Sequence, residues 1–144
     1  MKALRLLGLA GGIALSLLML PGCWKKLSAP EEIEQRFGLK FPVAAKVQIV
    51  KDSPGSTTDL TYIRVTLNRL DFERLHTMAP FDKGMQYETD NPFFALSDPF
   101  PGWMPERDVK GRGGMLRFNN QSIMYFFDVS KPEQIEGWLL IARS

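Results

Sequence analysis

Ile123-Met124-Tyr125-Phe126-Phe127 is the stretch that most constrains the fold of this 144-residue chain. All five side chains are apolar, so an extended segment here would present apolar side chains on both of its faces. Such a pattern is typical of a strand in the middle of a sheet. Ser122–Asp128 is therefore predicted to be a central strand.

Its neighbours in the sequence predict the next strands. Met115–Phe118 would pair with the central strand across the turn Asn119-Asn120-Gln121, and Trp138–Ala142 would form the last strand. The glycine-rich run Gly111–Gly114 lacks the Lys-Ser/Thr sequel of a phosphate-binding loop. It is expected to be a turn that leads into the strand at Met115.

Another antiparallel hairpin is predicted earlier in the chain. Val43–Val50 and Leu60–Leu67 alternate side chains in the period-2 pattern of half-buried strands. The turn-forming run Lys51–Ser56 lies between them, which favours a hairpin with a longer loop.

Two short helices are indicated by their start signals. Ser28 is a preferred N-cap residue, Pro30 suits the first turn, and Gly38 would end the helix. Asn68 can cap a second helix that ends before Pro80. The apolar stripe of that helix is expected to consist of Leu67, Leu70, Leu75 and Met78. Together these elements predict a small single α+β domain with a mostly antiparallel sheet, two short helices and a long irregular loop.

The N-terminus carries a different pattern. Met1-Lys2-Ala3-Leu4-Arg5 is positively charged, and residues 6–20 are almost all apolar or glycine. A charged start, an apolar stretch and a small residue before a cut site are typical of a secretory signal. A membrane-spanning helix needs about 20 apolar residues, more than this run has. The segment Leu20-Pro21-Gly22-Cys23 then ends on the single cysteine of the chain.

This ending resembles the lipobox of bacterial lipoproteins. Leu20, Gly22 and Cys23 match the pattern of that family, whereas Pro21 departs from it, and the resemblance covers residues 1–23 only. It implies cleavage between Gly22 and Cys23, a diacylglycerol on the Cys23 thiol, and a mature chain held on a membrane.

The chain would then divide into a signal peptide (1–22), a lipidated tether (23–30) and one globular domain (31–144). Loss of Lys2 and Arg5 leaves 16 basic residues against 16 acidic ones. A neutral domain has no general attraction for nucleic acid. Trp24 stands where an aspartate is associated with inner-membrane retention in well-studied lipoproteins. The resemblance therefore favours the outer membrane, facing the periplasm, in a host with two membranes.

Residues 81–114 have little periodicity, and long irregular segments are often binding loops. The candidate binding loop within them contains large apolar side chains and several stiffening prolines. Its candidate residues are Phe93, Phe94, Phe100, Trp103 and Met104. The alternative is that these side chains fold back and cover one face of the sheet as core, as a domain without disulfides requires.

A modest basic cluster follows the loop, formed by Arg107, Lys110, Arg112 and Arg117. It could contact anionic headgroups or an acidic partner, and the alternative is a solvated face. His76 is the only histidine and is expected to lie at a helix surface or cap. No metal site, cofactor or catalytic residue is predicted, since the loop carboxylates match no EF-hand spacing.

The preferred interpretation is a lipid-anchored, extracytoplasmic binding or envelope-accessory protein without catalysis, bound to the membrane through Cys23 and to a protein partner. An alternative is an immunity-type or inhibitor lipoprotein that neutralises a toxin or a lytic enzyme, with Asp98-Pro99-Phe100 as its contact knob. A third class is a hydrolase that uses loop carboxylates.

Overall fold

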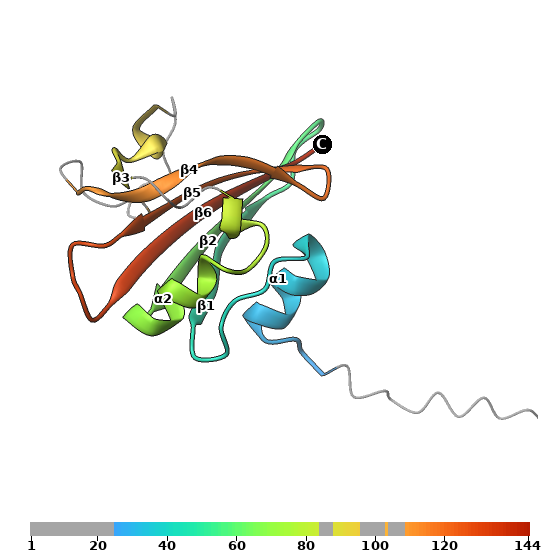
Figure 1. The fold of residues 1–144 in the computed structure, drawn as a ribbon. Helices are drawn as coiled ribbons and strands as arrows, with labels where there is room; N and C mark the ends of the chain where they lie inside the picture. Colours follow the sequence, from blue (N-terminus) through green and yellow to red (C-terminus); the bar gives the residue numbers. More distant parts are fainter. Residues whose placement is uncertain (1–24, 84–87, 96–102, 104–108) are drawn as a thin grey trace, which may run out of the picture.

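The computed structural model describes residues 25–83, 88–95, 103 and 109–144 (Figure 1). A six-stranded antiparallel sheet has the strand order β1-β2-β6-β5-β4-β3, with two helices packed on it. The elements are α1 (Ala29–Phe37), β1 (Lys46–Ser53), β2 (Asp59–Leu67), α2 (Arg69–Leu75), η1 (Phe81–Lys83), β3 (Glu88–Thr89), η2 (Pro92–Ala95), β4 (Gly111–Phe118), β5 (Gln121–Asp128) and β6 (Ile135–Arg143). The predicted α+β class with a mostly antiparallel sheet is confirmed.

β5 is the central strand that its composition predicts. It pairs with β6 on one side and β4 on the other over its full length. Tyr125 and Phe127 are buried on one face of the sheet, and Phe126 is buried on the other. Apolar cover is therefore needed on both faces.

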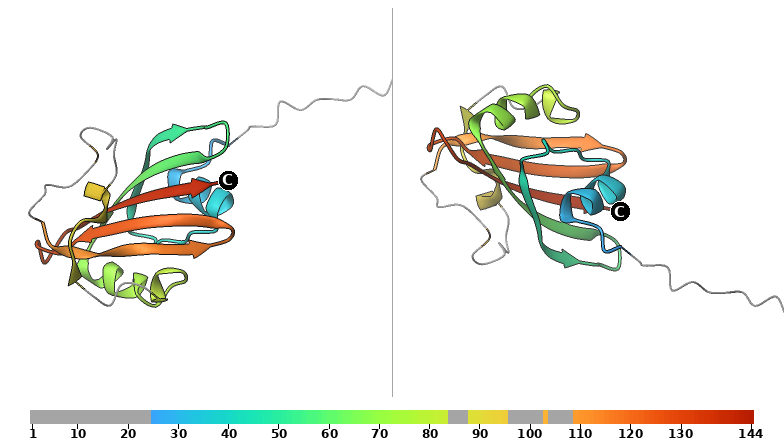
Figure 2. Two further views of the ribbon diagram at one scale, coloured as in Figure 1. Left: turned by 90° about the horizontal axis from the view of Figure 1, so that it is seen from above. Right: turned by 90° about the horizontal axis from the view of Figure 1, so that it is seen from below.

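One face of the sheet carries the helices, and we call this the helix side. Figure 2 shows α1 and α2 on the same side of the strands. Ile33 and Phe37 of α1 and Phe72 and Leu75 of α2 join the main core, together with apolar side chains of the inner strands. Strand side chains in this core are Ile63, Val65, Leu67, Ile123, Tyr125, Phe127, Ile135, Leu139 and Ile141.

α1 has the boundaries that its sequence signals predict. Ser28 and Glu31 form a capping box, and Gly38 ends the helix in the left-handed region at φ 70°. Arg36 then ties the helix to the sheet through two hydrogen bonds to the Asp52 carboxylate, at 2.9 and 3.0 Å.

α2 begins at its predicted cap, where the Asn68 side chain accepts a hydrogen bond from the Asp71 backbone N–H. The predicted stripe is wrong at Leu70, whose side chain is 73% exposed. Successive residues are rotated by about 100° around the helix axis, so Leu70 lies roughly 200° around the helix from Phe72 and 140° from Leu75. It therefore points away from the sheet, and Phe72 takes the core position.

Both ends of β1 differ from the prediction, and β6 begins at Ile135 rather than Trp138. β1 starts at Lys46 rather than Val43, because Val43 and Ala44 form a turn closed by a hydrogen bond from the Ala45 N–H to the Pro42 carbonyl. A β-bulge between Ile49 and Lys51 then lets the strand continue to Ser53.

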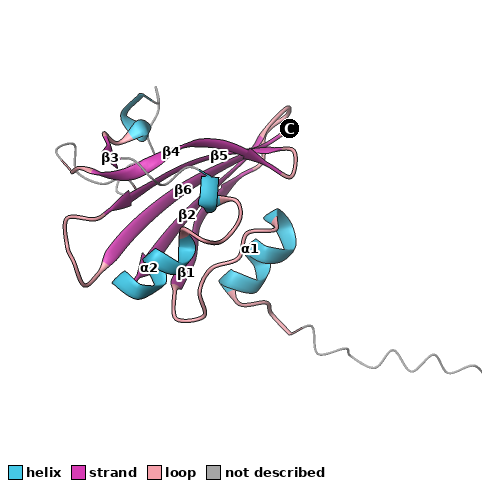
Figure 3. Ribbon diagram, in the orientation of Figure 1, coloured by secondary structure: helices cyan, strands magenta, loops and turns pink. Residues whose placement is uncertain are grey.

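The run Gly111–Gly114 is strand, not a turn (Figure 3). It pairs with β5 from Gly111 onward, and β3 pairs with its first residues. A Cβ added at Gly113 would collide with the Tyr125 carbonyl oxygen, so glycine permits this close pairing. The β4–β5 hairpin turns through Asn119 and Asn120, both at positive φ (52° and 58°).

No helix among the described residues is long and apolar enough to cross a membrane.

Candidate functional site

The face of the sheet opposite the helices is partly covered by a second apolar cluster, which we call the loop-side cluster. Its buried members are Tyr62, Phe93, Trp103, Phe126, Trp138 and Leu140. η2 contributes Phe93, and Trp103 comes from the segment between η2 and β4. The sheet is therefore sandwiched between helices on one side and irregular chain on the other.

Two residues of the candidate binding loop belong to this cluster. Phe93 is completely buried and Trp103 is 2% exposed. The Trp103 ring stands edge-on to Tyr62 at 5.0 Å and to Phe93 at 4.8 Å between ring centroids. Its indole N–H donates a long hydrogen bond of 3.4 Å to the Ile63 carbonyl, beside the bulge of β1. These two side chains cover the sheet, which is the alternative that the sequence leaves open.

The remaining loop candidates do not enter the site. Phe100 and Met104 lie outside the described residues, as does Arg107 of the predicted basic cluster. The backbone of Phe94 belongs to η2, but its side chain also lies outside the described part of the chain.

The described members of the basic cluster are not brought together. Arg112 and Arg117 are five residues apart on β4, so their side chains lie on opposite faces of the sheet. Arg112 lies on the helix side with its guanidinium 6.0 Å from the Phe72 ring centroid. Lys110 borders a separate shallow depression with Glu88 and Asp90. The cluster therefore does not form one continuous basic surface.

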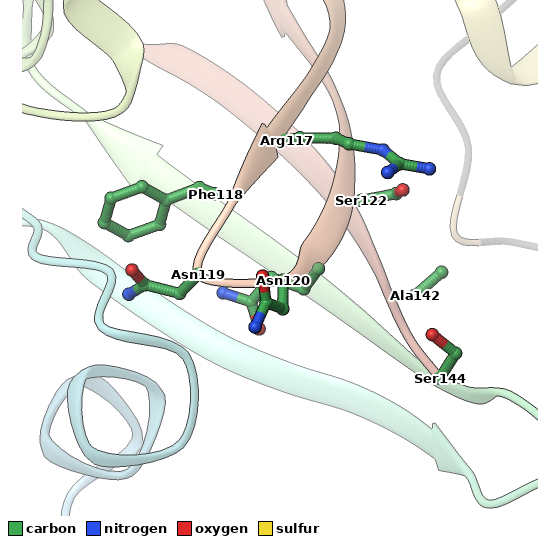
Figure 4. A pocket seen from close by; sticks show the side chains of 8 residues that line it. Arg117, Phe118, Asn119, Asn120, Ser122, Ala142 and Ser144 are labelled. Carbon is green, nitrogen blue, oxygen red and sulfur yellow. The ribbon is translucent and has the colours of Figure 1, made fainter.

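Arg117 instead borders a polar hollow at the end of the β4–β5 hairpin, which we call the hairpin pocket (Figure 4). Its volume is about 480 Å³. The lining residues are Arg117, Phe118, Asn119, Asn120, Gln121, Ser122, Ala142 and Ser144. Figure 4 shows Arg117 and Ser122 on the same side of the hairpin, with Phe118 pointing the other way.

The strand register explains why the hollow forms there. Ala142 of β6 pairs with Ser122 of β5, and Ser122 pairs with Arg117 of β4. The preceding row on the same face holds the larger side chains Leu140 and Met124. Two small side chains beside larger ones make a step in the surface, and the long Arg117 side chain forms its outer wall.

The pocket is suited to an anionic group. No carboxylate side chain is among its lining residues. Arg117 makes no ion pair or ring contact with any described residue, unlike the other arginines that the structure describes. Those have partners: Arg36 with Asp52, Arg64 with Glu136, Arg69 with Glu73, Arg74 with Asp71, Arg112 with Phe72, and Arg143 with Asp59. A guanidinium without a partner among the described residues, on the same side of the hairpin as the Ser122 hydroxyl, can bind a carboxylate or phosphate oxygen.

A second polar depression, of about 280 Å³, lies at the other end of the same face. Arg64 and Glu136 line it, but they pair with each other at 3.4 Å, and the Thr66 hydroxyl donates to the same carboxylate at 3.1 Å. Lys46 also lines this depression, but so does the Glu136 carboxylate, which would repel an anion, whereas no carboxylate side chain lines the hairpin pocket.

His76 lies at the C-cap of α2, as predicted, with its side chain 21% exposed. Its Nε2 is buried without a hydrogen-bond partner among the described residues, and its ring packs edge-on against Phe72 at 4.6 Å. Burial is the main cause that lowers the pKa of His76; Glu73 opposes it, and the nearby Arg112 and Arg69 lower the pKa further. Within the described ranges no group of acidic, histidine or cysteine side chains could hold a metal ion.

Sequence reasoning singled out Arg117 but missed its neighbours in the pocket. Asn119 and Asn120 are recognisable in the sequence only as turn residues, and Ser122 and Ala142 carry no signal of their own. Only the pairing of β5 with both β4 and β6 places them around one hollow. Comparisons of the chain with protein-family models, with curated proteins and with solved structures gave no significant match.

Proposed function

We propose that this chain is a small lipoprotein, anchored through Cys23 to the outer face of a membrane or to the periplasmic face of an outer membrane, that acts as a non-catalytic binding module. The lipobox-like ending at Cys23 supports the anchor. The short distance in sequence from Cys23 to the start of α1 at Ala29 supports a domain held close to the bilayer.

The hairpin pocket is the observation that carries the binding function. It combines Arg117, which has no partner among the described residues, with the Ser122 hydroxyl in an open, polar hollow. These groups bind and orient an anionic partner group, whereas acid–base catalysis needs a titratable pair held in place. A protein that presents a carboxylate or a phosphate on its surface is the partner that fits best.

The anchor is tested by expressing wild type and Cys23→Ala in a bacterial host. We expect wild type to fractionate with membranes, and its N-terminal peptide to begin at residue 23 with the mass of a diacylglycerol. The variant should keep its signal peptide and gain no lipid. Equal mass and equal membrane retention for the two chains would contradict the anchor.

The binding function is tested by a crosslinking pull-down from detergent-solubilised membranes, with Arg117→Glu as the test variant. Lys131→Glu is the matched control, since it reverses an exposed cation in the turn at the opposite end of β5. We expect a specific partner with wild type and with the control, and its loss with Arg117→Glu at unchanged thermal stability. Retention of the partner by Arg117→Glu would exclude the pocket. Capture of one foreign secreted toxin or lytic enzyme would instead favour the immunity alternative.

A further inference from the structure

We infer that the helix side of the domain lies against the lipid bilayer, and that the loop side with its hairpin pocket faces away from it. This inference rests on the proposed lipid anchor. The surface concerned is formed by the outward side chains of α1, of the 38–45 connection and of α2, which lie on one side of the sheet (Figure 2).

The length of the tether is the first argument. Four residues lie between Cys23 and the Ser28 cap of α1, and the five residue steps allow at most about 18 Å when fully extended. Residues 25–28 leave the domain from the first turn of α1, on the helix side (Figure 1). Packed layers lie roughly 10 Å apart, so the loop-side surface is about 20 Å away from α1 around the edge of the sheet. The tether is too short to place that surface on the membrane without strain.

The positions of the exposed apolar side chains point the same way. Leu27, Val43, Leu70 and Met115 are the large apolar residues that are exposed among those described. Leu27 lies in the tether and Leu70 on the outer face of α2. Val43 is fully exposed in a turn whose neighbours Phe41 and Ala45 pack into the helix-side core. Three of these four side chains can thus enter the interfacial region of a bilayer, and only Met115 lies on the loop side.

Charge on this surface does not oppose the contact. Glu32 is paired with Arg36 at 3.0 Å, Glu34 with Lys40 at 3.3 Å and Glu73 with Arg69 at 3.3 Å. The exposed Glu31 is bonded to the Ser28 cap and lies near Lys25. The exposed Lys25 and Lys26 add positive charge next to the anchor, where an anionic leaflet attracts them. A phospholipid surface, rather than a further protein, is therefore the occupant that this side fits.

The lone cysteine permits a direct test, because lipidation consumes its thiol and an introduced cysteine is then unique. Val43→Cys, Leu70→Cys and Met115→Cys are each made in the lipidated mature chain and labelled with an environment-sensitive fluorophore. Leu70 and Met115 are matched in exposure, at 73% and 72%. The proteins are reconstituted into phosphatidylethanolamine–phosphatidylglycerol vesicles with and without bromine-labelled acyl chains.

We expect the bromolipid to quench the probes at positions 43 and 70 at least threefold more than the probe at position 115. Equal quenching at the three positions, or stronger quenching at 115, would overturn the inference while leaving the anchor intact. Mass analysis of the same preparations shows whether residue 23 carries lipid. An unlipidated chain would overturn both the proposed function and the orientation that rests on it.

Discussion

Single residues in this domain take their roles from burial rather than from their chemical type. Phe93 of η2 and Met115 of β4 are both large and apolar, yet the first is completely buried and the second is 72% exposed. The Phe93 ring packs against the Trp103 ring, whereas most of the Met115 side chain contacts solvent. Exposure therefore decides what a substitution at each position does.

Phe93→Ala is expected to destabilise the domain by about 3–5 kcal/mol, because it opens a cavity between the Trp103 ring and the sheet. Met115→Ala is the control and should change stability by less than about 0.5 kcal/mol. Urea denaturation of both variants measures the difference. A Phe93→Ala variant as stable as wild type would show that Phe93 is not a core residue, and would favour its role in the candidate binding loop.

His76 predicts a pH dependence. Its pKa is lowered in the folded state from the ordinary value of 6.5, chiefly by burial. The unfolded chain therefore takes up a proton before the folded one, so stability is complete above pH 6.5 and falls as the pH drops through the lower, folded pKa. Melting temperature measured between pH 7 and pH 5 should decrease for wild type.

His76→Phe should flatten this dependence, since phenylalanine fills the same site without a titratable group. The Asp52 carboxylate, whose pKa Arg36 lowers from an ordinary value of 3.8, should dominate only at more acidic pH. An equally steep fall for His76→Phe between pH 7 and pH 5 would show that another group is responsible.

At the scale of elements, β4 shows how tertiary pairing can override local preference. Its first half is glycine-rich, and glycine disfavours strands because it loses more backbone entropy on folding than other residues. Pairing with β5 compensates, and the missing Cβ atoms let the two backbones approach closely.

Substitutions at the neighbouring glycines Gly113 and Gly114 distinguish the entropy cost of glycine from the need for close approach of the two backbones. A Cβ at Gly113 would collide with the Tyr125 carbonyl oxygen, whereas a Cβ at Gly114 would make ordinary contacts with the Tyr125 hydroxyl and ring, at 3.6 and 3.9 Å. Gly113→Ala should therefore cost about 1–3 kcal/mol, and Gly114→Ala should be neutral or slightly stabilising. Chemical denaturation of the pair tests this, and equal effects would refute the register of β4 on β5.

At the scale of the whole molecule, the helix-side core and the loop-side cluster share the same strands. β2, β5 and β6 each contribute side chains to both. Because both clusters pack on these strands, disrupting the strands under one cluster would also expose the apolar side chains of the other. The domain is therefore expected to unfold in one cooperative step.

Tryptophan fluorescence tests this cooperativity, because Trp103 and Trp138 both lie in the loop-side cluster. In a Trp24→Phe background, their denaturation midpoint should coincide with the midpoint from far-ultraviolet circular dichroism, which reports the helices and the sheet. A fluorescence transition at clearly lower denaturant would show that the loop-side cluster opens on its own.

The sequence by itself determined the features that depend on neighbouring residues. Ser28, Gly38 and Asn68 marked helix ends through local capping, and the uninterrupted apolar run of β5 marked a central strand. The lipid anchor at Cys23 also rests on a purely local pattern, and it stays a prediction.

Only the tertiary structure decided where side chains distant in the sequence meet. It buried Trp103 against Tyr62, turned Leu70 outward, separated Arg112 from Arg117 across the sheet, and gathered Arg117, Ser122 and Ala142 around one pocket. These outcomes follow from strand order and register, which depend on long-range pairing. Because a shift of one residue moves a side chain to the opposite face, local sequence signals cannot fix them.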